Sequence, residues 1–148
     1  MKSILAYAIA FASECHKDQL DKGGKPYILH PLRMMMRLRT NDEELMAIAV
    51  LHDVVEDCGV TYGQLKQLGM TDRVIEGVKF LTKVEGITYE QFIVNMTNNI
   101  DAMLVKREDL RDNSDITRLK GITEKDVARM QKYMRAFKFL DEQLKERR

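Results

Sequence analysis

The segment LHDVVEDC, residues 51–58, gathers one histidine and three carboxylates within six positions, directly after the apolar run LMAIAV. On a continuous α-helix, which turns about 100° per residue, Glu56, Asp53 and Asp57 fall about 40°, 100° and 140° from His52, all on one side. Three neighbouring carboxylates repel one another and are costly to bury, and a divalent cation would relieve both problems. Histidine and aspartate side by side suit Mn²⁺, Fe²⁺ or Zn²⁺, while Glu56 and Asp57 are placed to orient a water or to transfer protons.

A charged helix end is also the usual form of a solvated surface, so this segment alone leaves both readings open. Two further stretches favour the metal. His30, in KPYILHPLRM, follows a loop at a helix start, although such a histidine is more commonly a cap or a surface residue. Asp109 and Asn113, in VKREDLRDN, lie four residues apart and therefore on one face of a helix, which by itself also fits an ordinary charged helix.

The elements that must position these residues are predicted to be helices. The chain has only two prolines and eight glycines, and no run of residues is typical of a strand. We expect a first helix over about 3–20 that stops at DKGGKPY, a second from about His30, a third from about 42 through VVED, and another over about 100–112. Threonine caps predict further helix starts at Thr61, Thr88 and Thr123, and either Thr71 or Asp72 is expected to begin another helix. The total is six to eight helices in one all-α domain.

Composition sets the outer limits. The 148 residues suffice for one compact domain, and the near balance of 24 Lys+Arg against 23 Asp+Glu indicates neither a disordered chain nor a strongly basic nucleic-acid surface. The apolar N-terminal stretch has helical spacing without a signal-peptide cleavage site, and no apolar run reaches the roughly 20 residues of a membrane span. Cys15 and Cys58 stand alone, which fits a reducing compartment. We therefore expect a soluble, cytoplasmic protein; nothing in the sequence sets its oligomeric state.

Four stretches together carry a resemblance to a known family: AIAFASECHKDQLDKGGKPYILHPLRM, AIAVLHDVVEDCGVTYGQL, VIEGVKFLTK and VKREDLRDN. Their order and spacing resemble those of HD-domain hydrolases of the RelA/SpoT type, specifically the stand-alone small alarmone hydrolases. The resemblance implies a helical bundle around a single divalent metal ion, usually Mn²⁺, that hydrolyses the 3′-pyrophosphate of (p)ppGpp. It predicts one HD hydrolase domain over residues 1–148, with a family-like core over about 6–113 and a C-terminal helix over about 124–145.

The resemblance also implies roles for individual residues. Glu56 and Asp57 match the pair that activates the hydrolytic water, and Lys22 and Asn113 match residues that contact the nucleotide. The implied metal ligands are His30, His52, Asp53 and Asp109.

Two stretches depart from the family pattern. Asp21 stands where the family usually has an arginine that stacks on the base, so we expect Asp21 either to accept hydrogen bonds from a base edge or to face away. In VKREDLRDN, Leu110 and Asp112 replace an arginine and a histidine, and Glu108 adds a further acidic residue. The extra negative charge beside a phosphate site would be unfavourable unless these carboxylates face solvent.

Three functions follow as hypotheses. The first is metal-dependent removal of the 3′-pyrophosphate from a guanosine or adenosine alarmone, without synthesis, because the chain has no room for a synthetase domain. The second keeps the metal but changes the substrate to another phosphorylated nucleotide, NADPH or a 3′-pyrophosphorylated RNA end. The third is a catalytically silent module that senses a nucleotide. The expected partner is a small-molecule nucleotide; membranes are not expected, nor nucleic acid other than an RNA 3′ end.

Overall fold

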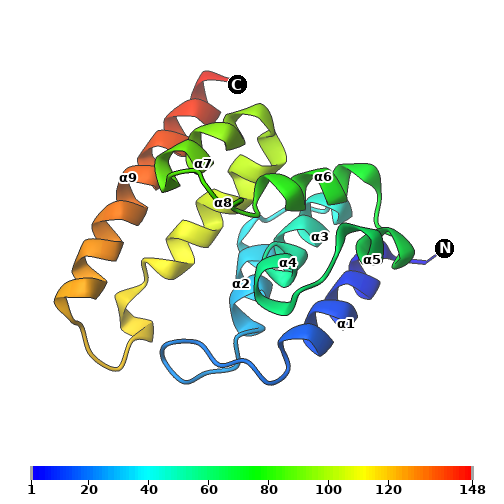
Figure 1. The fold of residues 1–148 in the computed structure, drawn as a ribbon, viewed down its shortest axis with the longest axis horizontal. Helices are drawn as coiled ribbons and strands as arrows, with labels where there is room; N and C mark the ends of the chain where they lie inside the picture. Colours follow the sequence, from blue (N-terminus) through cyan, green and yellow to red (C-terminus); the bar gives the residue numbers. More distant parts are fainter. Residues whose placement is uncertain (1, 148) are drawn as a thin grey trace.

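The protein is described by a computed structural model that covers residues 2–147, with nine α-helices and two short 3₁₀ helices, η1 and η2 (Figure 1). The elements are α1 (Ile4–His16), α2 (Leu29–Arg37), α3 (Glu43–Leu51), α4 (Val54–Cys58), α5 (Tyr62–Gln67), α6 (Asp72–Phe80), α7 (Tyr89–Asn95), η1 (Met96–Asn98), α8 (Ile100–Asn113), η2 (Ile116–Arg118) and α9 (Glu124–Glu146). Within residues 2–147 the β-structure is limited to an isolated bridge between Leu20 and Pro26. The prediction of an all-α fold is confirmed.

Helix α3 is the centre of the fold. It packs against α1, α2, α6 and α8, and its apolar residues are buried on every side. A helix that is apolar all round belongs inside a core, and α3 explains why the run LMAIAV looked so hydrophobic. Asp42 caps its start by accepting a hydrogen bond from the backbone N–H of Leu45 at 3.2 Å. The other end of α3 therefore delivers His52 to a fixed place at the edge of the core.

The predicted continuous helix from residue 42 through VVED is wrong. Helix α3 ends at Leu51, α4 begins at Val54, and His52 and Asp53 form the turn between them. The Nδ1 atom of the His52 ring lies 2.8 Å from the Ala49 carbonyl oxygen, and Asp53 leaves the helical geometry at φ −110° and ψ 0°. The angles calculated for one continuous helix do not apply across this turn, and the split raises the number of helices above the expected six to eight.

The other helix boundaries follow the sequence more closely. The predicted threonine caps at Thr61, Thr71, Thr88 and Thr123 are confirmed, because each side chain accepts a hydrogen bond from the third residue that follows it. The first helix ends at His16, four residues earlier than expected. No helix within residues 2–147 is both long and apolar enough to cross a membrane.

Helices α2, α8 and α9 and two loops form the part of the fold that carries the candidate site. Helix α2 packs against both α3 and α8, and α8 and α9 lie side by side, joined through η2 (Figure 1). The loop after α1 packs tightly on the η2 segment, because a Cβ atom on Gly23 would lie only 2.2 Å from the carbonyl oxygen of Arg118. Glycine is therefore required at position 23 for the two loops to meet.

Candidate metal centre and adjoining cavity

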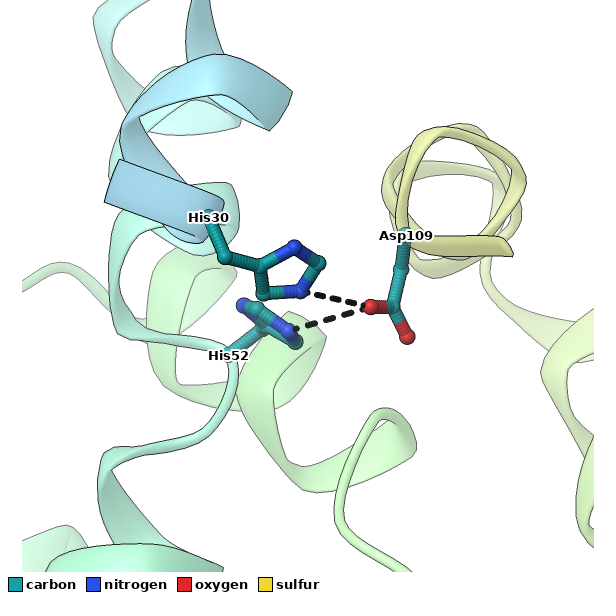
Figure 2. A group of neighbouring side chains, drawn as sticks. All are labelled: His30, His52 and Asp109. Atoms are coloured by element: carbon teal, nitrogen blue, oxygen red, sulfur yellow. Dashed lines mark hydrogen bonds and ion pairs between the residues drawn. The ribbon is translucent and has the colours of Figure 1, made fainter. Parts of the chain in front are cut away.

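Three of the four predicted metal ligands meet at one point inside the protein. His30 from α2, His52 from the end of α3 and Asp109 from α8 each offer a donor atom, and these atoms lie within 4.8 Å of one another (Figure 2). His30 Nε2 is 2.9 Å and His52 Nε2 3.6 Å from Asp109 Oδ1. All three residues are at most 5% exposed. Two imidazoles and a carboxylate in this arrangement are a donor set that suits a first-row divalent cation.

The hydrogen bonds on the far side of each histidine ring turn the other nitrogen toward this point. His52 Nδ1 must donate, because its partner is the carbonyl oxygen of Ala49, and His30 Nδ1 lies 2.6 Å from a carboxylate oxygen of Asp112. Each ring therefore presents Nε2 to the centre. Among the described residues His52 Nε2 has no well-directed hydrogen-bond partner. A buried nitrogen without a partner beside two acceptors fits a metal ligand.

The fourth predicted ligand, Asp53, lies beside this group rather than within it. Its Oδ2 atom is 2.9 Å from His52 Nε2, off the direction in which the ring N–H points. The same oxygen accepts a short hydrogen bond from the hydroxyl of Tyr27. Burial and the charge of Asp53 raise the pKa of Tyr27 above its ordinary value, so the phenol keeps its proton and acts as a donor. The structure thus places Asp53 next to the centre, held by Tyr27.

The charged groups around the centre shift the pKa values of its histidines and of Asp109 in opposite directions. Burial alone would lower the pKa of His52, but the negative charges of Asp53 and Asp109 outweigh it and raise the pKa. Burial would also raise the pKa of Asp109, yet the charge of Lys106, 2.8 Å away, and the two histidines lower it. Asn113 donates to Asp109 Oδ1 at 2.9 Å and helps to hold the carboxylate. A divalent cation would take the place of the protons on the two Nε2 atoms.

The acidic departures Glu108 and Asp112 do not face solvent: their exposed fractions are 3% and 0%. Glu108 accepts a hydrogen bond from Arg111 at 2.8 Å. Asp112 is surrounded by cationic groups, with the three arginines Arg33, Arg37 and Arg118 bonded to it in addition to the ring of His30. The charge that the sequence placed beside a phosphate site is therefore compensated inside the protein rather than by water.

A cavity of about 320 Å³ adjoins the centre, with His30 in its wall. The loop between α1 and α2 and the start of α2 supply one side, and the end of α8, the η2 segment and the start of α9 supply the other. The lining combines cationic, aromatic and apolar side chains: Lys22, Arg118, Arg129, Tyr27, Tyr133, Leu20, Leu119 and Met130. This size and mixture suit a small ligand that carries both a ring and negative charge.

The three predicted substrate-binding residues, Asp21, Lys22 and Asn113, all line this cavity but differ in the bonds that they already make. Lys22 is exposed and makes no ion pair with any residue in the described range, whereas Asn113 is bonded to Asp109. Asp21 accepts hydrogen bonds from the backbone N–H groups of Gly23 and Lys25, both at 2.9 Å, and its other oxygen binds Arg118 at 3.0 Å. Both oxygens of Asp21 thus hold the loop and Arg118, and its contact with a substrate remains a prediction.

The predicted catalytic pair, Glu56 and Asp57, lies on α4, exposed and outside the cavity lining. Glu56 accepts a hydrogen bond from the backbone N–H of Lys83 at 2.7 Å. Asp57 accepts one at 3.1 Å from the side chain of Gln19, which itself lines the cavity. Asp57 therefore approaches the cavity through Gln19, and the catalytic role of both carboxylates remains a prediction.

Several residues of the site were not singled out from the sequence. Tyr27, Lys106 and Arg118 contact predicted site residues, and Arg129 and Tyr133 line the cavity from α9. Tyr27 lies within the quoted stretch KPYILHP, and Arg129 and Tyr133 lie four residues apart, so that they share one face of α9. The position of Tyr27 in that stretch and the four-residue spacing on α9 could have identified Tyr27, Arg129 and Tyr133 from the sequence. Arg118 carries no such signal, because its partner Asp21 is 97 residues away in the chain.

The comparisons with known proteins agree with this geometry. Residues 8–120 match the family described as HD domain. Over 116 residues the chain is 34% identical to the guanosine-3′,5′-bis(diphosphate) 3′-pyrophosphohydrolase of Aquifex aeolicus, an alignment that covers 72% of this chain and 16% of the relative. It is 31% identical over 122 residues to the bifunctional (p)ppGpp synthase/hydrolase SpoT of Escherichia coli K12, covering 74% of this chain and 17% of that protein. The chain thus spans about one sixth of the length of these relatives.

A solved structure extends the likeness to the whole fold. The structure of a metazoan ortholog of SpoT, described as hydrolysing ppGpp, matches with a TM-score of 0.71 and 21% sequence identity, covering 99% of this chain and 97% of that one. At this identity the likeness establishes the fold. The helical bundle expected from the resemblance is therefore confirmed.

Proposed function

The chain belongs to the HD-domain family, and on that premise we propose that it is a metal-dependent phosphohydrolase that removes the 3′-pyrophosphate from an alarmone of the (p)ppGpp type. The products would be pyrophosphate and GDP or GTP, or the adenosine equivalents. The observation that carries the proposal is the pair of buried Nε2 atoms of His30 and His52, turned to Asp109 beside a cavity with cationic lining. The names of the curated relatives supply the substrate class.

In this proposal His30, His52 and Asp109 hold one divalent ion, with Asp53 beside them as the fourth predicted ligand. We expect Mn²⁺, because a mixed imidazole and carboxylate donor set accommodates it and the family resemblance implies it. When bound, the ion would lower the pKa of water and offset negative charge on the phosphoryl group that is attacked. Tyr27 keeps Asp53 in place, and Lys106 and Asn113 do the same for Asp109.

The protein's own side chains would handle substrate and protons. Lys22 is free to place its charge against the phosphates, and Asn113 stands between Asp109 and the cavity. Water attacks the phosphorus joined to the ribose 3′-oxygen, the bond to that oxygen breaks, and the oxygen takes a proton as pyrophosphate leaves. Glu56 and Asp57 are proposed to receive the proton of the water and return it, a contribution of about 10²- to 10⁴-fold. Asp57 is linked to the cavity by Gln19.

A second substrate class deserves the same test because base recognition is not decided by Asp21. Its two oxygens are engaged by the loop backbone and by Arg118, and the guanidinium of Arg118 is itself shared between Asp21 and Asp112. The described part of the cavity therefore presents no obvious selective contact for guanine. Another phosphorylated nucleotide such as NADPH, or a 3′-pyrophosphorylated RNA end, stays the alternative. A small-molecule nucleotide partner and a cytoplasmic location, which suits the free thiols of Cys15 and Cys58, complete the proposal.

The experiment is product analysis with purified protein, with Mn²⁺ or with a chelator, against ppGpp, ppApp and NADPH. We expect manganese-dependent release of pyrophosphate from at least one alarmone. Asp109→Asn and Asp53→Ala should each remove that activity by at least about 10²-fold, because each alters the donor set of the ion. Glu108→Gln is the matched control: it neutralises a buried carboxylate of the same helix that bonds Arg111 and none of the ligands.

Two outcomes would contradict the proposal. Stoichiometric metal binding without turnover of any of the three substrates would remove the alarmone assignment and direct the search to RNA ends or to nucleotide sensing. Turnover that persists in chelator would remove the metal from the mechanism.

A further inference from the structure

Asp112 is the most enclosed carboxylate at the site and is not among the residues that meet at the metal centre. Its side chain is 0% exposed. One oxygen accepts from Arg33 Nε and Arg37, both at 2.9 Å, and the other lies 2.6 Å from His30 Nδ1 and 2.8 Å from Arg118. Burying a carboxylate is costly unless it is paired, and here every direction is paired.

The hydrogen bond between His30 and Asp112 connects this buried carboxylate to a predicted metal ligand. A carboxylate accepts, so it keeps a proton on His30 Nδ1 and leaves Nε2, which lies 2.9 Å from Asp109 Oδ1, as the nitrogen that would release its proton to bind an ion. We propose that Asp112 is a positioning residue that fixes the ring orientation and tautomer of His30 for metal binding. The inference rests on the metal centre of the proposed function and is independent of the substrate.

Arg118 extends the effect to the wall of the cavity. It donates to Asp112 through one terminal nitrogen, at 2.8 Å, and to Asp21 through the other, at 3.0 Å. Asp21 in turn holds the backbone of the loop that carries Lys22, and Gly23 of that loop lies against the backbone of Arg118. The chain of contacts from Asp21 through Arg118 and Asp112 to His30 links the loop to the metal ligand. Changes at Arg118 should therefore alter metal affinity, although Arg118 touches no ligand.

A carboxylate that served only to neutralise three arginines would matter for stability but not for the ring of His30. The variant Asp112→Asn separates the two roles. Its amide oxygen would stay with Arg33 Nε and Arg37, which can only donate, so its NH₂ group would take the place of the oxygen that faces His30 Nδ1 and Arg118. That contact favours a proton on Nε2, the nitrogen that must be free to bind the ion.

The test measures Mn²⁺ affinity by calorimetry, without nucleotide, for wild type and variants whose folding is checked by circular dichroism. We expect Asp112→Asn to bind Mn²⁺ about 10- to 100-fold more weakly, the usual cost of losing such a partner. Arg118→Gln should bind several-fold more weakly, since the position of Asp112 is then less restrained. Arg73→Ala controls for loss of an arginine from an ion-pair cluster that does not include Asp112, and Glu108→Gln controls for loss of a buried carboxylate. Both controls should bind Mn²⁺ as wild type does.

A second measurement needs no variant. Nitrogen-15 spectra of wild type loaded with diamagnetic Zn²⁺ should show His30 protonated at Nδ1, with that proton protected from exchange. A proton on Nε2, or unchanged Mn²⁺ affinity in folded Asp112→Asn, overturns the inference while the proposed function stands. Wild type that binds neither Mn²⁺ nor Zn²⁺ overturns both. Metal binding as expected with no nucleotide hydrolysis would leave the inference intact and remove only the proposed reaction.

Discussion

The structure contains two charge clusters of opposite design. In the Asp112 cluster, one buried anion is surrounded by cationic groups: His30, Arg33, Arg37 and Arg118. In the Arg73 cluster, one cation on α6 is surrounded by anions at the starts of α3 and α8: Asp42, Glu44 and Asp101. The central carboxylate of the first has 0% of its side chain exposed, whereas the central guanidinium of the second has 38% exposed.

The difference shows that the number of ion pairs does not measure their importance. Both clusters join elements far apart in the sequence with bonds of similar length. In the Arg73 cluster water reaches the guanidinium itself and screens its charge, so the pairs add little to the free energy of unfolding. In the Asp112 cluster no water replaces a lost partner, and the anion also contacts a predicted metal ligand, His30. Burial, together with the bond to His30, makes the first cluster a part of the site.

The largest contrast should come from removing the central residue of the buried cluster. Asp112→Ala would leave three arginines and His30 facing one another without their anion. We expect the free energy of unfolding to fall by about 3–5 kcal/mol, the cost of breaking a buried ion pair. Urea unfolding of the metal-free protein measures it. A loss below about 1 kcal/mol, the range of a surface pair, would make the two clusters equivalent.

Stabilisation by bound metal should depend on the residues beside the Asp112 cluster and not on the Arg73 cluster. Mn²⁺ at 100 times its dissociation constant should stabilise the wild type by about 2.7 kcal/mol, because the ion binds only the folded centre. Arg73→Ala should gain the same amount, whereas His52→Ala should gain almost nothing. Thermal unfolding with and without Mn²⁺ provides the readout, and an equal gain in His52→Ala would place the ion elsewhere.

Acid should weaken the buried cluster in a defined direction. Burial alone would raise the pKa of Asp112, but the bonds from His30 and Arg33 and the charge of Arg118 hold it well below the ordinary value. A lowered pKa in the folded state stabilises above the unfolded value, near 3.9, and this stability disappears as the pH falls through the folded value. The stability difference between wild type and Asp112→Asn should thus shrink below about pH 4, as Asp112 itself takes up a proton. A difference unchanged to the lowest accessible pH would contradict this.

The smallest effect should be at the exposed cluster. Arg73→Ala should cost at most about 1 kcal/mol, and the cost should shrink further in 1 M salt, where the screening length is about 3 Å. Urea unfolding at low and high salt measures both. A larger, salt-independent cost would show that the 38% exposed guanidinium behaves as a buried one.

Local chemistry explains which features could be predicted from the sequence. A threonine cap depends on the residue and its third neighbour, so Thr61, Thr71, Thr88 and Thr123 located four helix starts. The candidate metal centre was predicted because His30, His52 and Asp109 lie in stretches whose order resembles a known family, and the structure brings these three side chains together.

Features that depend on distant partners were missed. No glycine or proline marks the break between α3 and α4, which follows from the bond of His52 to Ala49 and the burial of Val54. Asp112 in VKREDLRDN looked like part of an exposed charged helix, and its partner His30 is 82 residues away. Charge pairing across such separations leaves no local pattern.

The same separation sets the time at which the site can form. His30 and His52 lie in the first half of the chain, where α1 and α2 each pack against α3. Their partners come much later in the chain, since Asp109 and Asp112 lie 79 and 82 residues from His30 and Arg118 follows both. Contacts this far apart in sequence carry a high entropic cost of loop closure. Metal capture should therefore be a late event in folding, so an early-bound ion would meet two histidines whose carboxylate partners have yet to arrive.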